Sequence, residues 1–242
     1  EKEVAGLPKS PYELKDTPLL SYDPKSTQQH LIRQQAQGYL NNMMRLDEGV
    51  GLLLDRLKAD GLLKNTAIIF FGDNGPPLAR AKANCWDAGI RIPMFIAWPD
   101  GNIPQNKRTK ALVSTVDLFA TILDMAGLAP VKNLPSRSLM PLLKNPDHEF
   151  REYAITEMNF HVIGEYKPWR TIQNRTHKLH FRYDSEGHRQ IMLFDLTKDP
   201  LEQTDLSNDD NYTAIKTKLV AELEAWQTRT ADPTRFPAYV KN

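Results

Sequence analysis

The sequence predicts an α/β protein, in which the latter part of a mixed sheet is followed by a smaller α+β region of antiparallel strands and a terminal helix. Apolar residues recur at three- and four-residue spacing over 28–60, which indicates a long helix. An apolar run at 67–71 ends abruptly in polar residues, as a buried strand does. Beyond residue 148, short strand-like stretches follow one another, which is typical of an antiparallel sheet. We therefore predict two domains, 1–148 and 149–242.

The amino-terminal region is predicted to be an extended segment followed by the long helix. Residues 1–27 contain four prolines and show little periodicity, which indicates a connecting segment. The apolar stripe of the helix is formed by Leu40, Met43, Met44, Val50, Leu54 and Leu57. Asp47 lies on this stripe, where an unpaired buried charge would be costly. It lies either at the edge of the stripe in water or in a hydrogen bond to a neighbouring loop.

A second strand and a second helix are predicted in the middle of the chain. Residues 92–98 are expected to join 67–71 in the main sheet. The helix is predicted over 114–126. Ser114 can cap its start, Asp117 takes the favourable third position, and Gly127 can end it.

The carboxyl-terminal region is predicted to be a small antiparallel sheet packed against a helix. Residues 128–150, which precede it, are rich in proline and are expected to be irregular. Four short strands are predicted over 151–158, 168–174, 177–183 and 190–196. A helix over 211–229 should cover the sheet. Its apolar face is formed by Ile215, Leu219, Leu223 and Trp226.

Composition excludes several classes of partner. The chain has 31 Lys and Arg residues against 30 Asp and Glu residues, so nucleic acid is not expected, because phosphate-backbone binders usually carry a strong basic excess. No apolar run approaches the roughly 20 residues that span a bilayer, so no membrane partner is expected. The single cysteine, Cys85, has no activating base beside it and is expected to be a buried structural thiol. His177, His180 and His188 show no zinc spacing and are expected at the surface.

Oxygen-bearing side chains follow the first predicted strand. Asp73 offers a carboxylate and Asn74 a carbonyl, which are hard donors suited to Ca²⁺ or Mg²⁺. Open α/β sheets build their sites just past the carboxyl ends of strands. Gly72 and Gly75 allow the backbone to turn tightly there. Lys82 lies nine residues beyond Asp73, so a short loop can return its ammonium to the same place. The alternatives are an ordinary Asx turn and a solvated loop lysine.

These residues belong to a longer pattern that covers nearly the whole chain. The strand ends in Gly72-Asp73-Asn74-Gly75, and the loop runs through Lys82 to Asp87-Ala88-Gly89-Ile90-Arg91-Ile92-Pro93. Further matching segments are 94–99, 114–123, 138–143 and 193–203. Together they resemble the sulfatases of the alkaline-phosphatase-like superfamily, which implies that fold. Within the family, the most similar group is the heparan N-sulfatases (N-sulfoglucosamine sulfohydrolases), on the segments 14–18, 45–51, 168–172 and 224–233.

The resemblance implies a site and a reaction. Asp73 and Asn74 would bind Ca²⁺, and Lys82 would be the catalytic lysine that contacts the sulfate, with nearby Arg80 as the alternative. N-sulfatases use arginine at the position of Lys82, so lysine there favours an O-sulfatase. The reaction would be hydrolysis of a sulfate ester or sulfamate on a sulfated sugar, such as a glycosaminoglycan like heparan sulfate.

Two further substrate contacts are implied in the carboxyl-terminal region. His161 lies shortly before 168–170, where N-sulfatases place a histidine facing the sugar; the alternative is a surface histidine. Arg170 is a second candidate, and the alternative is that it pairs with an acid for structure. Glu157 and Asn159 are weaker candidates.

The family's nucleophile is not found in this sequence. Sulfatases use a formylglycine made from Cys or Ser in a Cys/Ser-x-Pro-Ser-Arg motif. Cys85 does not fit that motif, and the run 133–137 has asparagine in the nucleophile position. We therefore expect the carboxyl-terminal part of a sulfatase, inactive alone, whose partner is a missing amino-terminal portion. The resemblance also implies a periplasmic, secreted or lysosomal location. Three alternatives stay open: a phosphoester hydrolase of the same superfamily, an inactive module that binds sulfated glycans, and a truncation without an independent role.

Overall fold

The computed structural model describes residues 13–16, 28–78, 80–159, 168–183, 188–232 and 234. The chain forms two compact units. Unit 1 comprises Glu1–Lys82 and Arg91–Ile103, and unit 2 comprises Ala83–Ile90 and Pro104–Asn242. The predicted domain boundary at residue 148 lies inside unit 2, and it stays a prediction. No helix in these described ranges is both long enough and apolar enough to cross a membrane.

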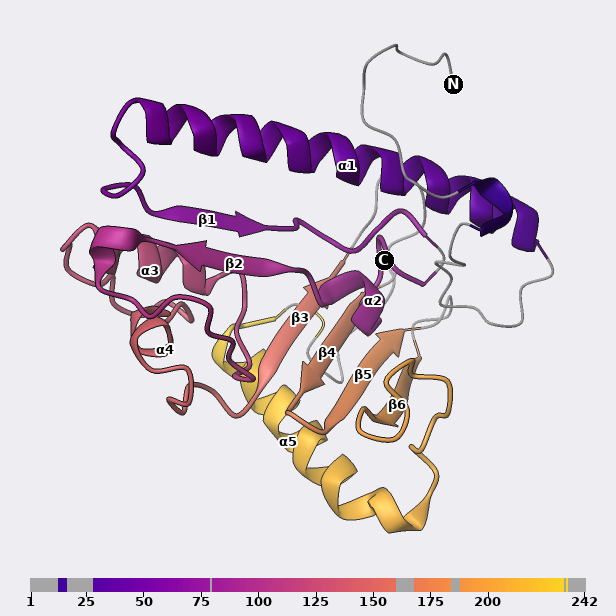
Figure 1. Ribbon diagram of the computed structural model, residues 1–242. Helices are drawn as coiled ribbons and strands as arrows, with labels where there is room; N and C mark the ends of the chain where they lie inside the picture. Colours follow the sequence, from indigo (N-terminus) through magenta and orange to yellow (C-terminus); the bar gives the residue numbers. More distant parts are fainter. Residues whose placement is uncertain are drawn as a thin grey trace. The chain divides into compact units, whose positions relative to one another are not determined.

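A long helix dominates unit 1. The turn η1 (Leu14–Asp16) precedes α1 (Gln29–Ala59), which confirms the helix predicted over 28–60 (Figure 1). Asp47 is exposed on α1, so the interpretation that places it in water is confirmed.

A two-stranded antiparallel sheet completes unit 1. β1 (Ile68–Phe71) pairs with β2 (Met94–Ala97), and the turn η2 (Pro99–Gly101) follows β2. Phe70 lies opposite Phe95, and their rings stack with centroids 4.6 Å apart. Such cross-strand aromatic pairs stabilise a sheet and fix its register. Both strands predicted for the main sheet are therefore present.

In unit 2, the predicted helix over 114–126 is shorter and is held differently at its start. α3 spans Asp117–Met125, and Ser114 does not cap it. The carboxylate of Asp117 instead accepts hydrogen bonds from the backbone N–H of Ser114 (2.8 Å) and of Arg137 (3.0 Å), and it pairs with Arg151. The helix is therefore present within the predicted range, but the prediction that the Ser114 side chain caps it was wrong. Gly127 ends the helix with a φ of 68°, as predicted.

Two short helices were not predicted. α2 spans Asp87–Ile90, and α4 spans Met140–Lys144 inside the stretch expected to be irregular. Pro141 lies in the first turn of α4, where a missing N–H costs nothing. Helices of four and five residues are too short to show a periodic apolar pattern, so periodicity could not predict them.

The small antiparallel sheet is present as predicted. Its order is β3-β4-β5-β6, and every neighbouring pair is antiparallel (Figure 1). The strands are β3 (Ala154–Met158), β4 (Trp169–Gln173), β5 (His177–Tyr183) and β6 (Arg189–Asp195). The turn η3 (Asp210–Tyr212) then leads into α5 (Thr213–Arg229).

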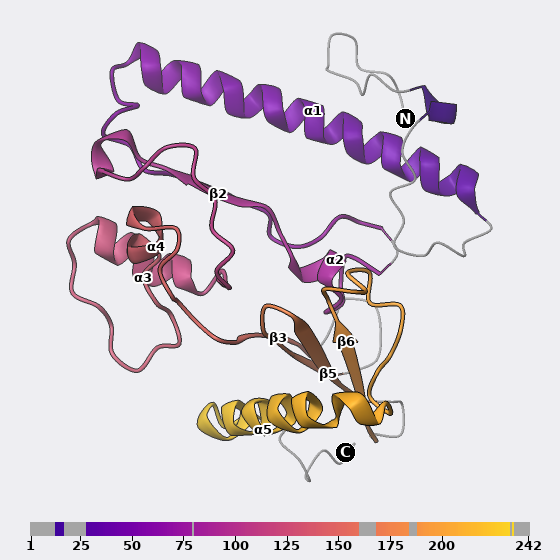
Figure 2. The same ribbon diagram turned by 60° about the horizontal axis from the view of Figure 1, so that its bottom comes forward.

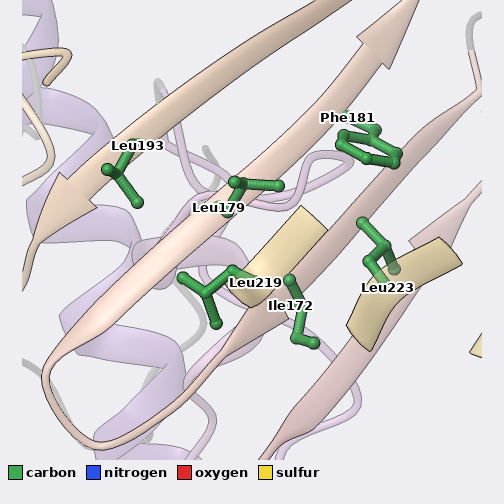
Figure 3. Close-up of a cluster of buried hydrophobic side chains, with 6 residues drawn as sticks. All are labelled: Ile172, Leu179, Phe181, Leu193, Leu219 and Leu223. Atoms are coloured by element: carbon green, nitrogen blue, oxygen red, sulfur yellow. The ribbon is translucent and has the colours of Figure 1, made fainter. Parts of the chain in front are cut away.

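Helix α5 covers one face of this sheet, and the main core lies between them (Figure 2). Six buried side chains form that core, from the sheet and from α5: Ile172, Leu179, Phe181, Leu193, Leu219 and Leu223 (Figure 3). Ile215 and Trp226 pack against it, so the predicted apolar face of α5 is confirmed. Each such buried side chain stabilises the fold by about 1.5–3 kcal/mol.

The other face of the sheet is covered as well, and this was not predicted. Successive strand residues point to opposite faces, so Lys178 and His180 face away from α5. The ring of Trp86, from the segment before α2, meets the rings of Trp169, His180 and Phe194 edge-on, at centroid distances of 5.3, 5.0 and 5.4 Å. His180 is therefore fully buried, and the prediction that it lies at the surface was wrong.

Candidate functional site

The loop after β1 presents the predicted metal ligands to solvent. Asp73 and Asn74 are both exposed. The Asn74 backbone N–H donates to Asp73 Oδ1 (2.9 Å), and Asn74 Nδ2 donates to the Gly75 carbonyl (2.8 Å). These bonds form a local turn that orients both side chains. They use one Asp73 oxygen and the nitrogen end of the Asn74 amide, and within the described ranges Asp73 Oδ2 and Asn74 Oδ1 accept no hydrogen bond.

The same loop brings the backbone of Lys82 back toward these residues. The Gly72 N–H donates to the Pro93 carbonyl at 3.0 Å, which ties the start of the loop to the chain entering β2. The Lys82 N–H donates to the Pro76 carbonyl, also at 3.0 Å. Lys82 is exposed, and its backbone is thus fixed to a residue three positions after Asp73. The structure therefore gathers Asp73, Asn74 and Lys82 on one loop.

Gly72 allows the loop after β1 to lie close to the chain at Ile92 and Pro93. Neither Gly72 nor Gly75 has a positive φ, so the expected use of glycine's backbone freedom is not seen. A Cβ on Gly72 would lie 3.4 Å from Pro93 Cδ and 3.5 Å from Ile92 Cβ. A side chain there would press on the segment that receives the hydrogen bond of Gly72.

The donors present fit part of a hard-cation site. Ca²⁺ takes 6–8 oxygen ligands, and an Asp carboxylate with an Asn carbonyl is a suitable start of such a set. Among the residues with described positions, no group of three or more His, Cys, Asp or Glu side chains is arranged to hold a metal ion. Any metal held by Asp73 and Asn74 would need further ligands.

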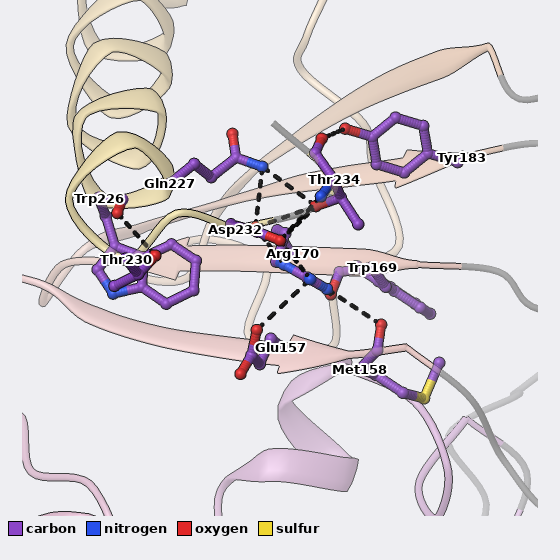
Figure 4. A network of polar contacts seen from close by, with 10 residues as sticks. All are labelled: Glu157, Met158, Trp169, Arg170, Tyr183, Trp226, Gln227, Thr230, Asp232 and Thr234. Carbon is purple, nitrogen blue, oxygen red and sulfur yellow. Dashed lines mark hydrogen bonds and ion pairs between the residues drawn. The ribbon is translucent and has the colours of Figure 1, made fainter. Parts of the chain in front are cut away.

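Of the two substrate contacts predicted in the carboxyl-terminal region, His161 and Arg170, the structure describes only Arg170. His161 lies outside the described residues, and its role stays a prediction. Arg170 is fully buried on β4, where Nε and Nη2 bind the two carboxylate oxygens of Asp232 at 2.7 and 2.8 Å (Figure 4). Its Nη1 donates to the carbonyls of Met158 (3.3 Å) and Trp169 (3.2 Å), and Glu157 lies 3.4 Å from Nη2. This geometry supports the structural interpretation of Arg170 and leaves no exposed surface for a saccharide.

The acid that Arg170 binds is itself held by several donors. Burial alone would raise the pKa of Asp232. Hydrogen bonds from Arg170, from the Thr234 backbone N–H and from Gln227 outweigh burial and lower the pKa to about 2. Asp232 is therefore a buried anion whose partners come from β4, from α5 and from Thr234, which lies beyond α5.

Cys85 is the buried thiol that the sequence predicted. It is 1% exposed, and burial raises its pKa to about 12, against smaller opposing effects that begin with a hydrogen bond to Thr171. A thiol with this pKa carries almost no thiolate at neutral pH, so Cys85 is not a nucleophile.

One polar cluster on the covered face of the sheet was not predicted. Lys178 Nζ lies 2.8 Å from Asp87 Oδ1 and 2.8 Å from Glu202 Oε1. In the sequence, Lys178 is a lysine between strand residues. A strand position that faces solvent has the same pattern, so this cluster could not be predicted.

The fold and this loop define an α/β protein of the alkaline-phosphatase-like class. The sulfatase family model matches residues 8–128, and the model described as N-sulphoglucosamine sulphohydrolase, C-terminal, matches residues 81–229. The chain belongs to the sulfatase family, as the sequence motifs predicted.

Individual relatives agree with this assignment. An ulvan-active sulfatase of Formosa agariphila is 26% identical over 93% of this chain, which spans 43% of that protein. Human N-sulphoglucosamine sulphohydrolase is 25% identical over 78% of this chain, which spans 47% of that protein. A solved structure in complex with its substrate, D-glucosamine-2-N,6-O-disulfate, is 25% identical, with a TM-score of 0.77 over 89% of this chain and 45% of that one. The chain thus spans about half the length of the proteins it matches.

Proposed function

We propose that this chain supplies the metal-binding loop and the sulfate-binding lysine of a sulfatase that hydrolyses sulfate esters or sulfamates on a sulfated saccharide. The observation that carries the proposal is the loop after β1, which presents Asp73, Asn74 and Lys82 together in a member of the sulfatase family. The relative named for N-sulphoglucosamine and the structure that holds a disulfated glucosamine support a sulfated amino sugar as substrate. A glycosaminoglycan such as heparan sulfate contains such a sugar.

The metal is proposed to be Ca²⁺, held in part by Asp73 and Asn74. Both ligands are oxygen donors of the kind that Ca²⁺ prefers. When bound, the cation would neutralise charge on the sulfate oxygens. The remaining ligands are proposed to come from a portion of the protein outside this chain.

Lys82 is proposed to donate hydrogen bonds from its ammonium to the sulfate group. A charge-assisted hydrogen bond of this kind is strong, and it stabilises negative charge that develops on the leaving oxygen or nitrogen. His161 is proposed as a contact to the sugar. The nucleophile is proposed to be a formylglycine outside this chain, because the sequence contains no Cys/Ser-x-Pro-Ser-Arg motif. We also propose a periplasmic, secreted or lysosomal location.

The first test is to look for that nucleophile and for turnover in one preparation. Intact-mass analysis and peptide mapping of the native protein should find a formylglycine in a companion or longer chain. That preparation should release sulfate from N-sulfated or 6-O-sulfated glucosamine, measured by ion chromatography with Ca²⁺ present. Tight binding of the sugar without sulfate release would instead favour the glycan-binding module. A phosphoester hydrolase is not favoured, because the curated relatives quoted above are sulfatases.

Two variants then test the roles of the loop. Lys82→Ala should lower kcat/KM by about 10²–10³-fold, as the loss of a group that stabilises developing charge does. Lys64→Ala is the matched control, because Lys64 is an exposed lysine of the same unit. Asp73→Ala should weaken Ca²⁺ binding in isothermal titration. Unchanged activity in Lys82→Ala would overturn the proposed role of this lysine.

A further inference from the structure

The segment that follows Lys82 is built into the core of unit 2. Residues 83–90 belong to unit 2, whereas Lys82 is the last residue of unit 1 before them. Cys85 and Gly89 are buried, and Trp86 lies edge-on against three rings of the sheet. Lys82 is joined to this anchored segment by one peptide bond.

A buried ion-pair cluster holds this segment at Asp87. Lys178 Nζ, on β5, lies 2.8 Å from Asp87 Oδ1, and the Lys178 side chain is 0% exposed. Glu202 joins the cluster twice: Oε1 lies 2.8 Å from Lys178 Nζ, and Oε2 accepts a 2.6 Å hydrogen bond from the Asp87 backbone N–H. Lys178 thus holds the Asp87 carboxylate, and Glu202 holds the Asp87 backbone N–H. The two carboxylates give the buried ammonium charged partners, because charge without partners is costly away from water.

The backbone conformation supports a positioning role. Ala83, the residue after Lys82, has a φ of 63°, and Glu202 has a φ of 55°. Residues with a side chain seldom adopt this left-handed region, and they remain there only where surrounding contacts enforce it. For Glu202 those contacts are the ion pair with Lys178 and the hydrogen bond accepted from the Asp87 backbone N–H. For Ala83 the anchored residues 85–89 lie immediately downstream.

We propose that Lys178 and Glu202 are positioning residues for Lys82: they fix Asp87 to the carboxyl-terminal sheet, and the segment that contains Asp87 continues directly from Lys82. This inference rests on the proposed function, in which Lys82 binds the sulfate. It gives the small sheet a part in the reaction, although none of its described residues has to touch the substrate.

Hydrogen–deuterium exchange on this chain tests the proposal without any turnover. In Lys178→Met, the amides of Asp87, Gly89 and Ile90 should exchange at least about tenfold faster, since ordered hydrogen bonds there depend on the anchor. The Lys82 amide, which donates to Pro76, should also exchange faster. Unchanged protection of the β4 and β5 amides shows that the sheet still folds. Lys218→Met is the matched control, because Lys218 pairs with Glu152 on the surface.

The milder variant Asp87→Asn covers the case in which Lys178→Met does not fold. Asn keeps an oxygen for Lys178 and leaves β5 unaltered, so the same amides should exchange faster by a smaller factor. Unchanged protection at Lys82 in either folded variant overturns the inference, even if residues 85–90 loosen.

A double-mutant cycle in the active preparation separates positioning from a general loss of stability. If Lys178 acts through Lys82, then Lys178→Met should lower kcat/KM in the wild-type background and add little in the Lys82→Ala background. Losses that simply multiply would overturn the inference. Absence of sulfate release from the wild-type preparation would count against the proposed function, while the exchange of the Lys82 amide still decides whether the anchor positions that residue.

Discussion

Replacing Arg170 should destabilise the carboxyl-terminal sheet more than any surface change. In Arg170→Met the guanidinium that binds both oxygens of Asp232, at 2.7 and 2.8 Å, is lost. Asp232 has a side chain that is 1% exposed, so its charge would remain buried without its main partner. Breaking a buried pair in this way costs about 3–5 kcal/mol. The carbonyls of Met158 and Trp169 would each lose a donor as well, which adds to the loss.

The assay is urea unfolding of the variant and the wild type, followed by tryptophan fluorescence. Arg175→Met is the control, because Arg175 is exposed in the turn between β4 and β5, and such a change should stay within about 0.5 kcal/mol. The double variant Arg170→Met, Asp232→Leu should recover about half of the loss, since it removes the stranded charge. A loss below about 1 kcal/mol in Arg170→Met would refute the reasoning. So would weaker saccharide binding with unchanged stability, because Arg170 would then be a substrate contact.

Three further predictions follow from the same unit. The pKa of Asp232 is lowered to about 2, so its contribution to stability is complete above about pH 4 and is lost as the pH falls toward 2. Wild type should therefore lose about 2 kcal/mol more than Asp232→Asn in urea unfolding between pH 5 and pH 2, and equal losses would contradict the assignment. Leu223→Ala should cost about 2–5 kcal/mol, because this fully buried side chain of α5 leaves a cavity against the sheet, whereas exposed Leu201→Ala should cost far less. Cys85 should resist iodoacetamide at pH 8 until the protein is unfolded, and rapid labelling of the folded chain would show that the thiol is accessible.

The sequence predicted those parts of the fold that depend on local periodicity. The apolar stripe of α1, the four strands and the packed face of α5 each repeat within one element, so neighbouring residues carry the information. Asp73 and Asn74 could be proposed as metal ligands because an apolar strand ends just before them. The family was recognised from motifs that lie in a fixed order along the chain.

What the sequence could not predict depends on partners distant along the chain. His180 was expected at the surface because an alternating strand usually leaves one face in water. The residue that covers it, Trp86, comes from a segment more than 90 positions earlier. Arg170 finds Asp232 62 residues later, and Lys178 finds Asp87 91 residues earlier. No local pattern identifies such pairs, because each member looks like a solvated charge.

The two covered faces of β5 are held by different physical means, and this difference has a consequence for the site. Leu179 and Phe181 pack against α5, where shape and apolar area matter and several arrangements of similar side chains would serve. Lys178, on the opposite face, lies 2.8 Å from a carboxylate oxygen of Asp87 and 2.8 Å from one of Glu202, and such charged contacts depend on distance and direction. An apolar residue in place of Lys178 could bury as much surface, but it would not hold Asp87 by a directional contact. We infer that the charge is kept for precise placement more than for stability, which suits a segment directly joined to the lysine that we propose as the sulfate contact.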